Sequence, residues 1–201
     1  KICNKKKIYL IEDAAEVIGL EIRGKKCGSF GDVSTFSFYA NKQITSGEGG
    51  MIASNNKKII DKCNSLKNLC FGQKIRFRHE EIGWNYRYTN MQAALANSQL
   101  KRIENIVSTK KKIGKTYYKL LNKNNKIYMP PPILNNKENI YWIVGILIKG
   151  SYTTAKTLSK YLLKHGIQTR PFFYPMNKQP ILKKYFKKNK KYKNSEYLSK
   201  Y

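Results

Sequence analysis

Apolar residues recur at helical spacing from Asn90 to Leu120, and this periodicity constrains the fold more than any other feature of the chain. Thr89 or Asn90 can cap the start of the predicted helix, and Gly114 allows a bend. A helix of this length predicts a connection between two lobes. The apolar positions are Met91, Ala94, Leu95, Leu100, Ile103, Val107, Ile113, Tyr117 and Leu120.

Short strand-like segments precede the helix. The run KIYLI ends at Glu12 and Asp13, which predicts a buried strand with an acid at its carboxyl end. In open α/β sheets, ligand chemistry collects at the carboxyl ends of the strands. The further segments are a hairpin or irregular loop at EIRGKKCGSFGD, strands at VSTFSFYA and GGMIAS, and a helix at NKKIIDKCNSLKNL. The three strands therefore converge on the loop that contains Lys42.

The segment after the long helix predicts a second, smaller lobe. A strand at YWIVGILIK, a helix at TAKTLSKYLLKHG and a strand at IQTRPFF follow one another, with Gly166 ending the helix. Strand, helix and strand form a small α/β lobe. We place it at residues 122–201, after a first domain of residues 1–121.

Composition limits the cellular setting. With 201 residues, 41% of them hydrophobic, the chain can bury a core, and it has no apolar run long enough to span a membrane and no secretion signal. Four cysteines without a CxxC pair and two distant histidines argue against a metal site and predict a reducing cytoplasm. The chain lacks an initial Met and stops within the helix-like NSEYLSKY, so we expect a piece of a longer protein.

The net charge of +28 raises nucleic-acid binding as an alternative function. The tail ILKKYFKKNKKYKNSEYLSKY, which alternates Lys with Tyr and Phe, also permits stacking on single-stranded nucleic acid. However, the lysines spread along the whole chain, and arginine, the preferred reader of phosphates and bases, is scarce. We therefore favour a solvated basic surface, and for the tail an amphipathic surface helix.

The stretch FSFYANKQITSGEGG raises a question about one lysine, Lys42. A lysine becomes a catalyst when it forms a Schiff base with a carbonyl, and pyridoxal phosphate needs a partner acid on its ring nitrogen. Asp13 can be that acid, and Ser37 with the loop glycines can bind a phosphate. Composition alone only permits this chemistry and favours a surface loop lysine.

Three long motifs resemble the pyridoxal-phosphate-dependent sugar aminotransferases of the DegT/DnrJ/StrS type. The first, IEDAAEVIGLEIRGKKCGSFGDVSTFSFYANKQITSGEGGMIAS, is similar to the family's pattern of Glu-Asp-Ala-Ala, spaced glycines, Phe-Ser-Phe, Lys and Gly-Glu-Gly-Gly. The second and third are EIGWNYRYTNMQAALANSQLKRIE and GIQTRPFFYPMNKQP. The resemblance implies an α/β fold of the aspartate aminotransferase type, fold type I, with part of the large domain and a truncated small domain.

The resemblance also assigns cofactor roles. It implies that Lys42 is the Schiff-base lysine, that Asp13 contacts the pyridine nitrogen and that Ser37 binds the phosphate. Glu16 stands where many members have a Gln near the ring hydroxyl, and Asn85 matches an asparagine that reaches the cofactor phosphate of the neighbouring subunit, which implies a homodimer. The simpler readings are that Ser37 only alternates with its aromatic neighbours along a strand and that Asn85 satisfies a turn.

The implied reaction transfers an amino group, usually from L-glutamate, to a nucleotide-linked keto-sugar. The residue sequence of the motifs is most similar to that of the branch that aminates carbon 4 of 4-keto-6-deoxy sugars, such as perosamine synthases. The family's dehydratase branch has a His in place of Lys42. Arg87 is a candidate for a substrate carboxylate, or else pairs with Glu81. Candidates for lining the sugar-nucleotide site, or else for strand-end packing, are Arg170, Phe172, Phe173 and Tyr174.

Overall fold

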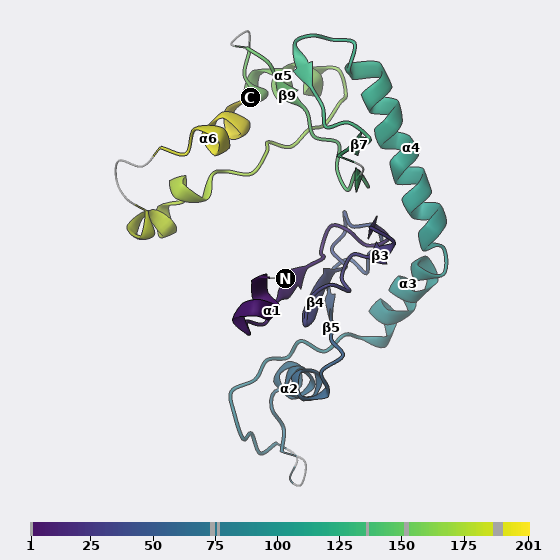
Figure 1. Cartoon of the computed structure of the whole chain (residues 1–201), viewed down its shortest axis with the longest axis vertical. Coiled ribbons are helices and arrows are strands. Elements are labelled where there is room, and N and C mark those ends of the chain that lie inside the picture. Colours follow the sequence, from purple (N-terminus) through teal and green to yellow (C-terminus); the bar gives the residue numbers. More distant parts are fainter. Residues whose placement is uncertain (1, 73–74, 76, 136, 151–152, 187–190) are drawn as a thin grey trace. The chain divides into compact units, whose positions relative to one another are not determined.

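The computed structural model describes all residues except 1, 73–74, 76, 136, 151–152 and 187–190. The chain divides into two compact units, which are described separately: Lys1–Lys112 with Asn135–Trp142, and Ile113–Leu134 with Ile143–Tyr201. The helix α4 contributes residues to both units (Figure 1). The predicted domain boundary after residue 121 remains a prediction.

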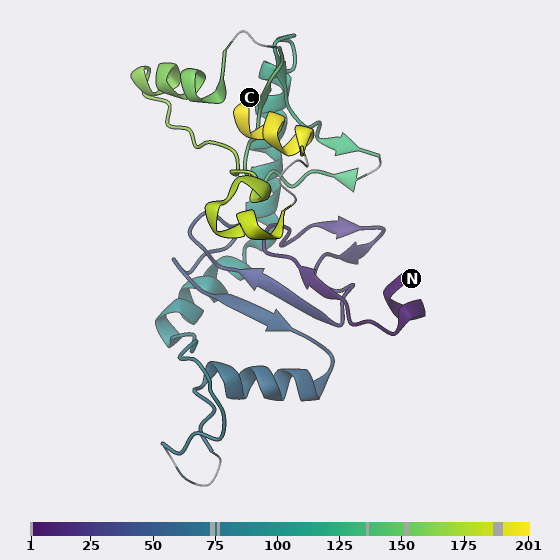
Figure 2. The ribbon, with the colours of Figure 1, turned by 90° about the vertical axis from the view of Figure 1, so that its left-hand side faces the viewer.

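The first unit contains a three-stranded sheet in the order β1-β4-β5. The strands β1 and β4 are parallel and β4 and β5 antiparallel. The helix α2 contacts β5, and Figure 2 shows it lying along that side of the sheet. The elements of this unit are α1 (Ile2–Lys6), β1 (Ile11–Asp13), β2 (Glu21–Ile22), β3 (Lys25–Lys26), β4 (Val33–Ser37), β5 (Gly50–Ala53), α2 (Lys57–Lys67), α3 (Asn90–Leu100), the first part of α4 (Ile103–Leu121) and β8 (Lys137–Glu138).

The predicted strands of the first unit are present, and the predicted hairpin is the antiparallel pair β2–β3. The prediction of a buried first strand was wrong, however. The strand starts only at Ile11, and Ile8, Tyr9 and Ile11 are 60%, 72% and 70% exposed. The reason is that β1 is an edge strand, which pairs with β4 alone among the described strands.

The predicted long helix is two helices. Thr89 caps α3 with a full capping box, in which Gln92 is the reciprocal partner. The break lies at Lys101 and Arg102, because the Arg102 N–H donates to Gln99 O, three residues back, and tightens the last turn. Gly114, where the sequence allows a bend, lies inside a continuous α4.

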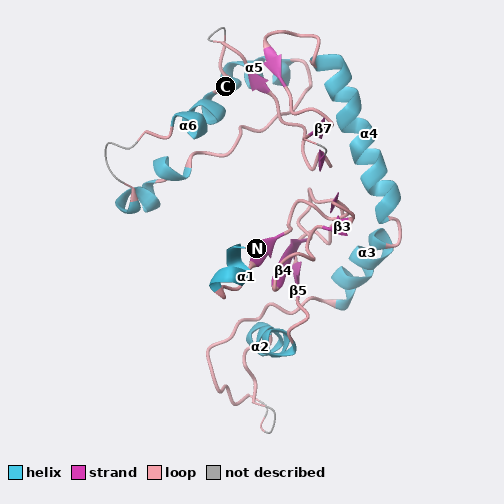
Figure 3. Ribbon diagram, viewed as in Figure 1, coloured by secondary structure: helices cyan, strands magenta, loops and turns pink. Residues whose placement is uncertain are grey.

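The second unit has less regular structure than predicted. Only Leu147–Ile148 of the predicted strand at 141–149 forms a strand, where it pairs with β6, and Tyr141 at the predicted start adopts a left-handed φ of 50°. Residues 167–173 are a loop (Figure 3) without strand pairing, although Gly166, with φ 77°, ends the preceding helix as predicted. The elements are the rest of α4, β6 (Ile127–Tyr128), β7 (Ile133–Leu134), β9 (Leu147–Ile148), α5 (Ala155–Lys164), η1 (Met176–Lys178), η2 (Pro180–Tyr185) and α6 (Lys193–Lys200).

The tail contains a short 3-10 helix and α6 rather than one amphipathic helix. Tyr185, in the 3-10 helix of this tail, is 71% exposed. No helix in the described part of the chain is long and apolar enough to cross a membrane. The four cysteines are free thiols.

Candidate active site

Asp13 and Ser37 lie on the same face of the sheet, at its carboxyl edge. Asp13 is the last residue of β1 and is in register with Thr35 of the parallel strand β4. Residues in register share a face and alternate residues of a strand share a face, so Asp13, Thr35 and Ser37 do so too. Asp13 Oδ1 accepts a hydrogen bond from the Ala15 N–H at 3.1 Å, and Ser37 Oγ accepts one from the Tyr39 N–H at 3.3 Å.

Glu12 and Ser34 point to the opposite face, where they hold the glycine loop. The Glu12 carboxylate accepts hydrogen bonds from the N–H groups of Gly28, Phe30 and Gly31 at 2.6, 2.9 and 3.3 Å. The Ser34 hydroxyl donates to Gly28 O at 2.6 Å. Burial opposes ionisation of Glu12, but these hydrogen bonds and the nearby Lys25 charge outweigh it and lower the pKa of the carboxyl.

Gly28 is required where it is. Its φ is 92°, a left-handed value, and a Cβ at this position would collide with the ring of Phe36. The sequence pattern of spaced glycines therefore has a local physical cause, because the loop must pass close over the sheet.

The loop that carries Lys42 connects β4 to β5 and is held by several side chains. Gln99 on α3 binds both backbone groups of Thr45: its Oε1 accepts from the Thr45 N–H at 3.1 Å and its Nε2 donates to Thr45 O at 2.7 Å. The buried Gln43 donates from Nε2 to Glu16 O at 2.7 Å. These bonds link the loop both to α3 and to the chain that leaves β1.

The Lys42 side chain is only 9% exposed. Its Nζ lies 3.7 Å from Glu16 Oε1, which is an ion pair but too long for a normal hydrogen bond. The same nitrogen lies 3.9 Å from the ring centroid of Trp142. The structure thus brings Lys42 together with Glu16, as the resemblance implies, and adds Trp142.

Sequence reasoning missed Trp142 because it placed this residue in a regular strand. Nothing in the one-dimensional pattern links position 142 to position 42, since the two are a hundred residues apart. The two positions meet because the chain turns at Tyr141 and the Trp142 Nε1 donates to Asn41 O at 3.1 Å.

Asn85 and Arg87 lie in an exposed segment before α3 and contact one another. The Arg87 Nε donates to Asn85 Oδ1 at 2.9 Å. Glu81, considered as the partner of Arg87, pairs with Lys62 instead. No described contact joins either residue to Lys42, and their predicted roles remain predictions.

Arg170, Phe172, Phe173 and Tyr174 lie in the second unit, whereas Lys42 lies in the first. All four are exposed, and the rings of Phe172 and Phe173 meet edge to face with centroids 5.4 Å apart. Their roles at a sugar-nucleotide site also remain predictions.

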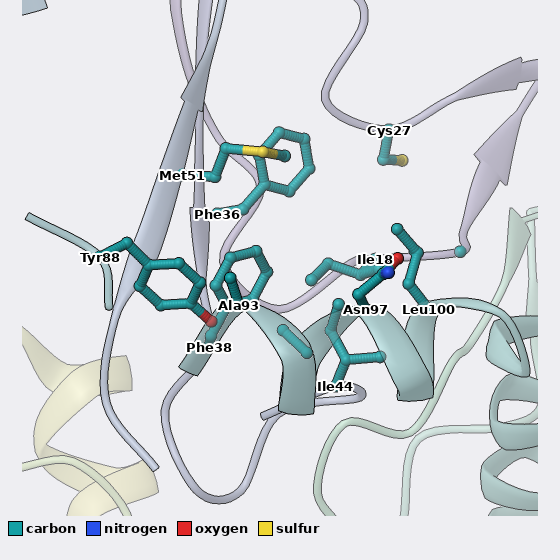
Figure 4. Close-up of a pocket in the computed structure, with 12 residues that line it drawn as sticks. Ile18, Cys27, Phe36, Phe38, Ile44, Met51, Tyr88, Ala93, Asn97 and Leu100 are labelled. Carbon is teal, nitrogen blue, oxygen red and sulfur yellow. The ribbon is translucent and has the colours of Figure 1, made fainter. Parts of the chain in front are cut away.

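A cavity of about 380 Å³ lies between the sheet and α3 (Figure 4). It faces the side chains of Phe36 and Met51, so it lies on the face of the sheet opposite to Asp13 and Ser37. The ring of Tyr88 packs against that of Phe38, with centroids 5.9 Å apart. This apolar cavity is therefore not the place where Asp13 and Ser37 meet a ligand.

The arrangement fits chemistry at an amine rather than at a metal. Among the described residues, no three His, Cys, Asp or Glu side chains cluster as metal ligands would. A shielded amine beside a carboxylate, with another carboxylate and a hydroxyl at the carboxyl edge of the same sheet, can bind a carbonyl compound that bears a phosphate and a basic ring nitrogen.

Comparison with known proteins identifies the whole chain as part of an aminotransferase family. The sequence model of the DegT/DnrJ/EryC1/StrS aminotransferase family matches residues 1–201. The GDP-perosamine synthase of Vibrio cholerae is 41% identical over 184 residues, which cover 90% of this chain and 49% of that protein. The GDP-perosamine synthase of Escherichia coli O157:H7 is 34% identical and matches 94% of this chain and 51% of its own length. The chain thus spans about half the length of these relatives.

Solved structures share the fold. Helicobacter pylori PseC, an aminotransferase involved in the biosynthesis of pseudoaminic acid, matches with a TM-score of 0.87 and 26% identity, over 98% of this chain and 54% of that one. An E. coli GDP-4-keto-6-deoxy-D-mannose-3-dehydratase with bound hydrated pyridoxal phosphate matches with a TM-score of 0.84 at 23% identity, over 99% and 56% of the two chains, and so shows the fold alone. The predicted fold, a partial chain of this aminotransferase architecture, is confirmed.

Proposed function

The chain belongs to the DegT/DnrJ/EryC1/StrS aminotransferase family, and from this premise we propose that it carries the catalytic lysine of a pyridoxal-phosphate-dependent sugar-nucleotide aminotransferase. One observation carries the proposal. Lys42 is nearly buried, yet its Nζ is 3.7 Å from the carboxylate of Glu16, whereas the ordinary ion pairs Lys26–Glu21 and Lys111–Glu138 are 2.6 Å long. Because burial of an amine without a tight partner is costly, this geometry indicates a reactive group rather than a structural one.

The described residues fit this cofactor. Lys42 would hold its carbonyl carbon, Asp13 its ring nitrogen, Ser37 its phosphate and Glu16 the region of its ring hydroxyl. The fit rests on the shared face of Asp13 and Ser37 and on the Lys42–Glu16 pair. When bound, pyridoxal phosphate supplies an electron sink for the pair released when a substrate C–H bond breaks.

The side chains of this chain have defined tasks in the reaction. The Asp13 carboxylate would face the ring nitrogen of the cofactor and favour its protonated form. The Lys42 amine, once free, would take the proton from the substrate Cα and return it to the cofactor carbon to which Lys42 had been bonded. The hydrogen bonds from Gln99 and Gln43 hold the Lys42 loop, so the amine works from a fixed position.

For the substrate we propose a nucleotide-linked 4-keto-6-deoxy sugar, with L-glutamate as amino donor. The GDP-perosamine synthases of V. cholerae and E. coli are the basis for this choice. The net charge of +28 suits an anionic nucleotide diphosphate. The dehydratase branch of the family has a histidine at this position, so the lysine at position 42 argues for transamination. The free cysteines suit a reducing cytoplasm.

We also propose that two copies share their active sites, with Asn85 reaching the cofactor phosphate of the other subunit. Apolar side chains surround Asn85 on the surface: Ile82, Trp84 and Tyr86 are 85%, 48% and 73% exposed. Such a patch is typical of a protein interface. A mixture of the Lys42→Ala and Asn85→Ala proteins should therefore recover up to about a quarter of the wild-type activity, because half of the dimers contain one intact site.

Covalent trapping tests the cofactor assignment directly. The intact protein is loaded with pyridoxal phosphate, reduced with borohydride, digested and analysed by mass spectrometry. We expect the reduced cofactor on the peptide that contains Lys42, in the wild type and in the control Lys26→Arg but not in Lys42→Arg. Attachment at another lysine, or no attachment with salt-dependent binding of nucleic acid instead, would contradict the proposal.

A further inference from the structure

Trp142 covers the Lys42 amine and has no place in the function described above. We propose that Trp142 is a positioning residue whose indole face holds the Lys42 side chain whenever its amine is not covalently engaged, most strongly when that amine carries a proton. The inference rests on the proposed function, in which Lys42 must be released from the cofactor and find it again. The inference concerns the position of the Lys42 amine after its release from the cofactor.

The geometry of the contact is that of a cation–π interaction. The Nζ lies 3.9 Å from the ring centroid, and the side chain is 9% exposed. Such contacts are strongest over Trp and when they are shielded from water. Other lysine–aromatic contacts of the chain, such as Lys25 over Phe30 at 5.1 Å and Lys184 over Tyr185 at 5.0 Å, are longer.

Trp142 is itself fixed in place from two sides. Its Nε1 donates to Asn41 O at 3.1 Å, next to Lys42 in the chain, and its carbonyl accepts from Lys110 Nζ on α4 at 3.4 Å. Burial lowers the pKa of Lys110. A ring held at both its edge and its backbone cannot swing away from the amine without breaking these bonds.

The backbone before Trp142 is strained. Tyr141 is buried and has a φ of 50°, which is uncommon for a large side chain, and its N–H donates to Asn139 Oδ1 at 2.9 Å. Strained residues persist where the surrounding structure overrides local preference, and they concentrate at functional sites. The strain here turns the chain so that residue 142, rather than a continuing strand, reaches the Lys42 loop.

An aromatic face does something that a carboxylate cannot. It attracts an ammonium group without accepting a proton from it, so the contact holds the side chain in place and leaves proton transfer to the substrate. Glu16, at 3.7 Å, supplies charge without a tight hydrogen bond. The ring also restricts the rotamers of a flexible side chain that would otherwise move freely after release.

A spectroscopic readout on the cofactor-free intact protein tests this. With 13C placed only at lysine Cε, the protons of Lys42 over the indole face should resonate upfield of those of most other lysines. The Lys42→Arg protein identifies the signal by its loss. We expect the upfield shift to disappear in Trp142→Leu, to persist in part in Trp142→Phe and to be unchanged in Trp84→Leu, which alters the chain's other tryptophan.

Acylation rates of individual lysines, measured by mass spectrometry, give a second readout. Lys42 should react roughly threefold or more faster in Trp142→Leu than in the wild type, because its ammonium form loses a favourable contact. A wild-type spectrum without a ring-shifted Lys42 signal would overturn the inference, even if the Trp142 variants do not fold. Borohydride trapping fails only if the proposed function is wrong, so the two failures are distinguishable.

Discussion

The loop of Lys42 and the segment 167–174 differ in how the chain holds them, although both belong to motifs that resemble the same family. Gln43, Ile44 and Ser46 of the loop are buried, and side chains from α3 and from after β1 bond to its backbone. Residues 167–174 are exposed, and a side-chain hydrogen bond there runs from Thr169 Oγ1 to Ser159 Oγ at 2.7 Å. The comparison teaches that the loop of Lys42, the proposed Schiff-base lysine, is held by buried side chains and by bonds from other elements, whereas the predicted sugar-binding residues lie in an exposed segment.

The largest expected effect is at Lys42. Lys42→Arg keeps the charge but removes the amine that reacts with a carbonyl, so we expect transaminase activity of the intact protein to fall by about 10³-fold or more. The free energy of unfolding should change little. Steady-state rates with glutamate and a nucleotide-linked 4-keto sugar measure this, with Lys26→Arg as the control. If the variant keeps a tenth of the wild-type activity, which corresponds to a loss of roughly 1.4 kcal/mol in activation free energy, Lys42 is not the Schiff-base lysine.

The next effect concerns the scaffold behind Asp13. Glu12→Gln removes a charged acceptor shared by three backbone N–H groups, so we expect the free energy of unfolding to fall by about 2 kcal/mol at neutral pH. The folded-state pKa of Glu12 lies below its ordinary value of 4.5, so its contribution is complete above 4.5 and is lost as the pH falls through the lower folded value.

Denaturant unfolding of both proteins at a series of pH values tests this prediction. The difference between wild type and Glu12→Gln should shrink as the pH drops below 4.5. Glu21→Gln, which changes the same charge in an exposed pair with Lys26, should have little effect at any pH. A difference independent of pH would show that the glycine loop does not depend on the Glu12 charge.

The smallest effect on stability is expected in the other region. Phe172 is 49% exposed, so Phe172→Ala should change the free energy of unfolding by less than about 0.5 kcal/mol. If the residue lines the sugar-nucleotide site, the KM for that substrate should rise about threefold or more while kcat changes less. Tyr185→Ala, at a similarly exposed ring outside the predicted site, is the control. A large loss of stability would instead place Phe172 in a core.

Local physical chemistry made several parts predictable. The capping box at Thr89, the turn at Gly166 and the β-branched strand β4 depend on neighbours within a few residues. The motif around Lys42 likewise lies in one continuous stretch, which is why the family and the fold could be predicted. The predicted strand at 167–173 is a loop and that at 141–149 is a strand only at Leu147–Ile148, because a strand needs a pairing partner and the apolar pattern does not say where one is present.

The sequence by itself therefore determined the family, the order of the elements and the candidacy of Lys42, Asp13 and Ser37. Only the tertiary structure decided that Asp13 and Ser37 share a face, that Glu12 binds the glycine loop from the other, and that Trp142 lies over the Lys42 amine. The physical reason is that these relations join residues distant in the chain, and they follow from strand register and helix packing rather than from local preference.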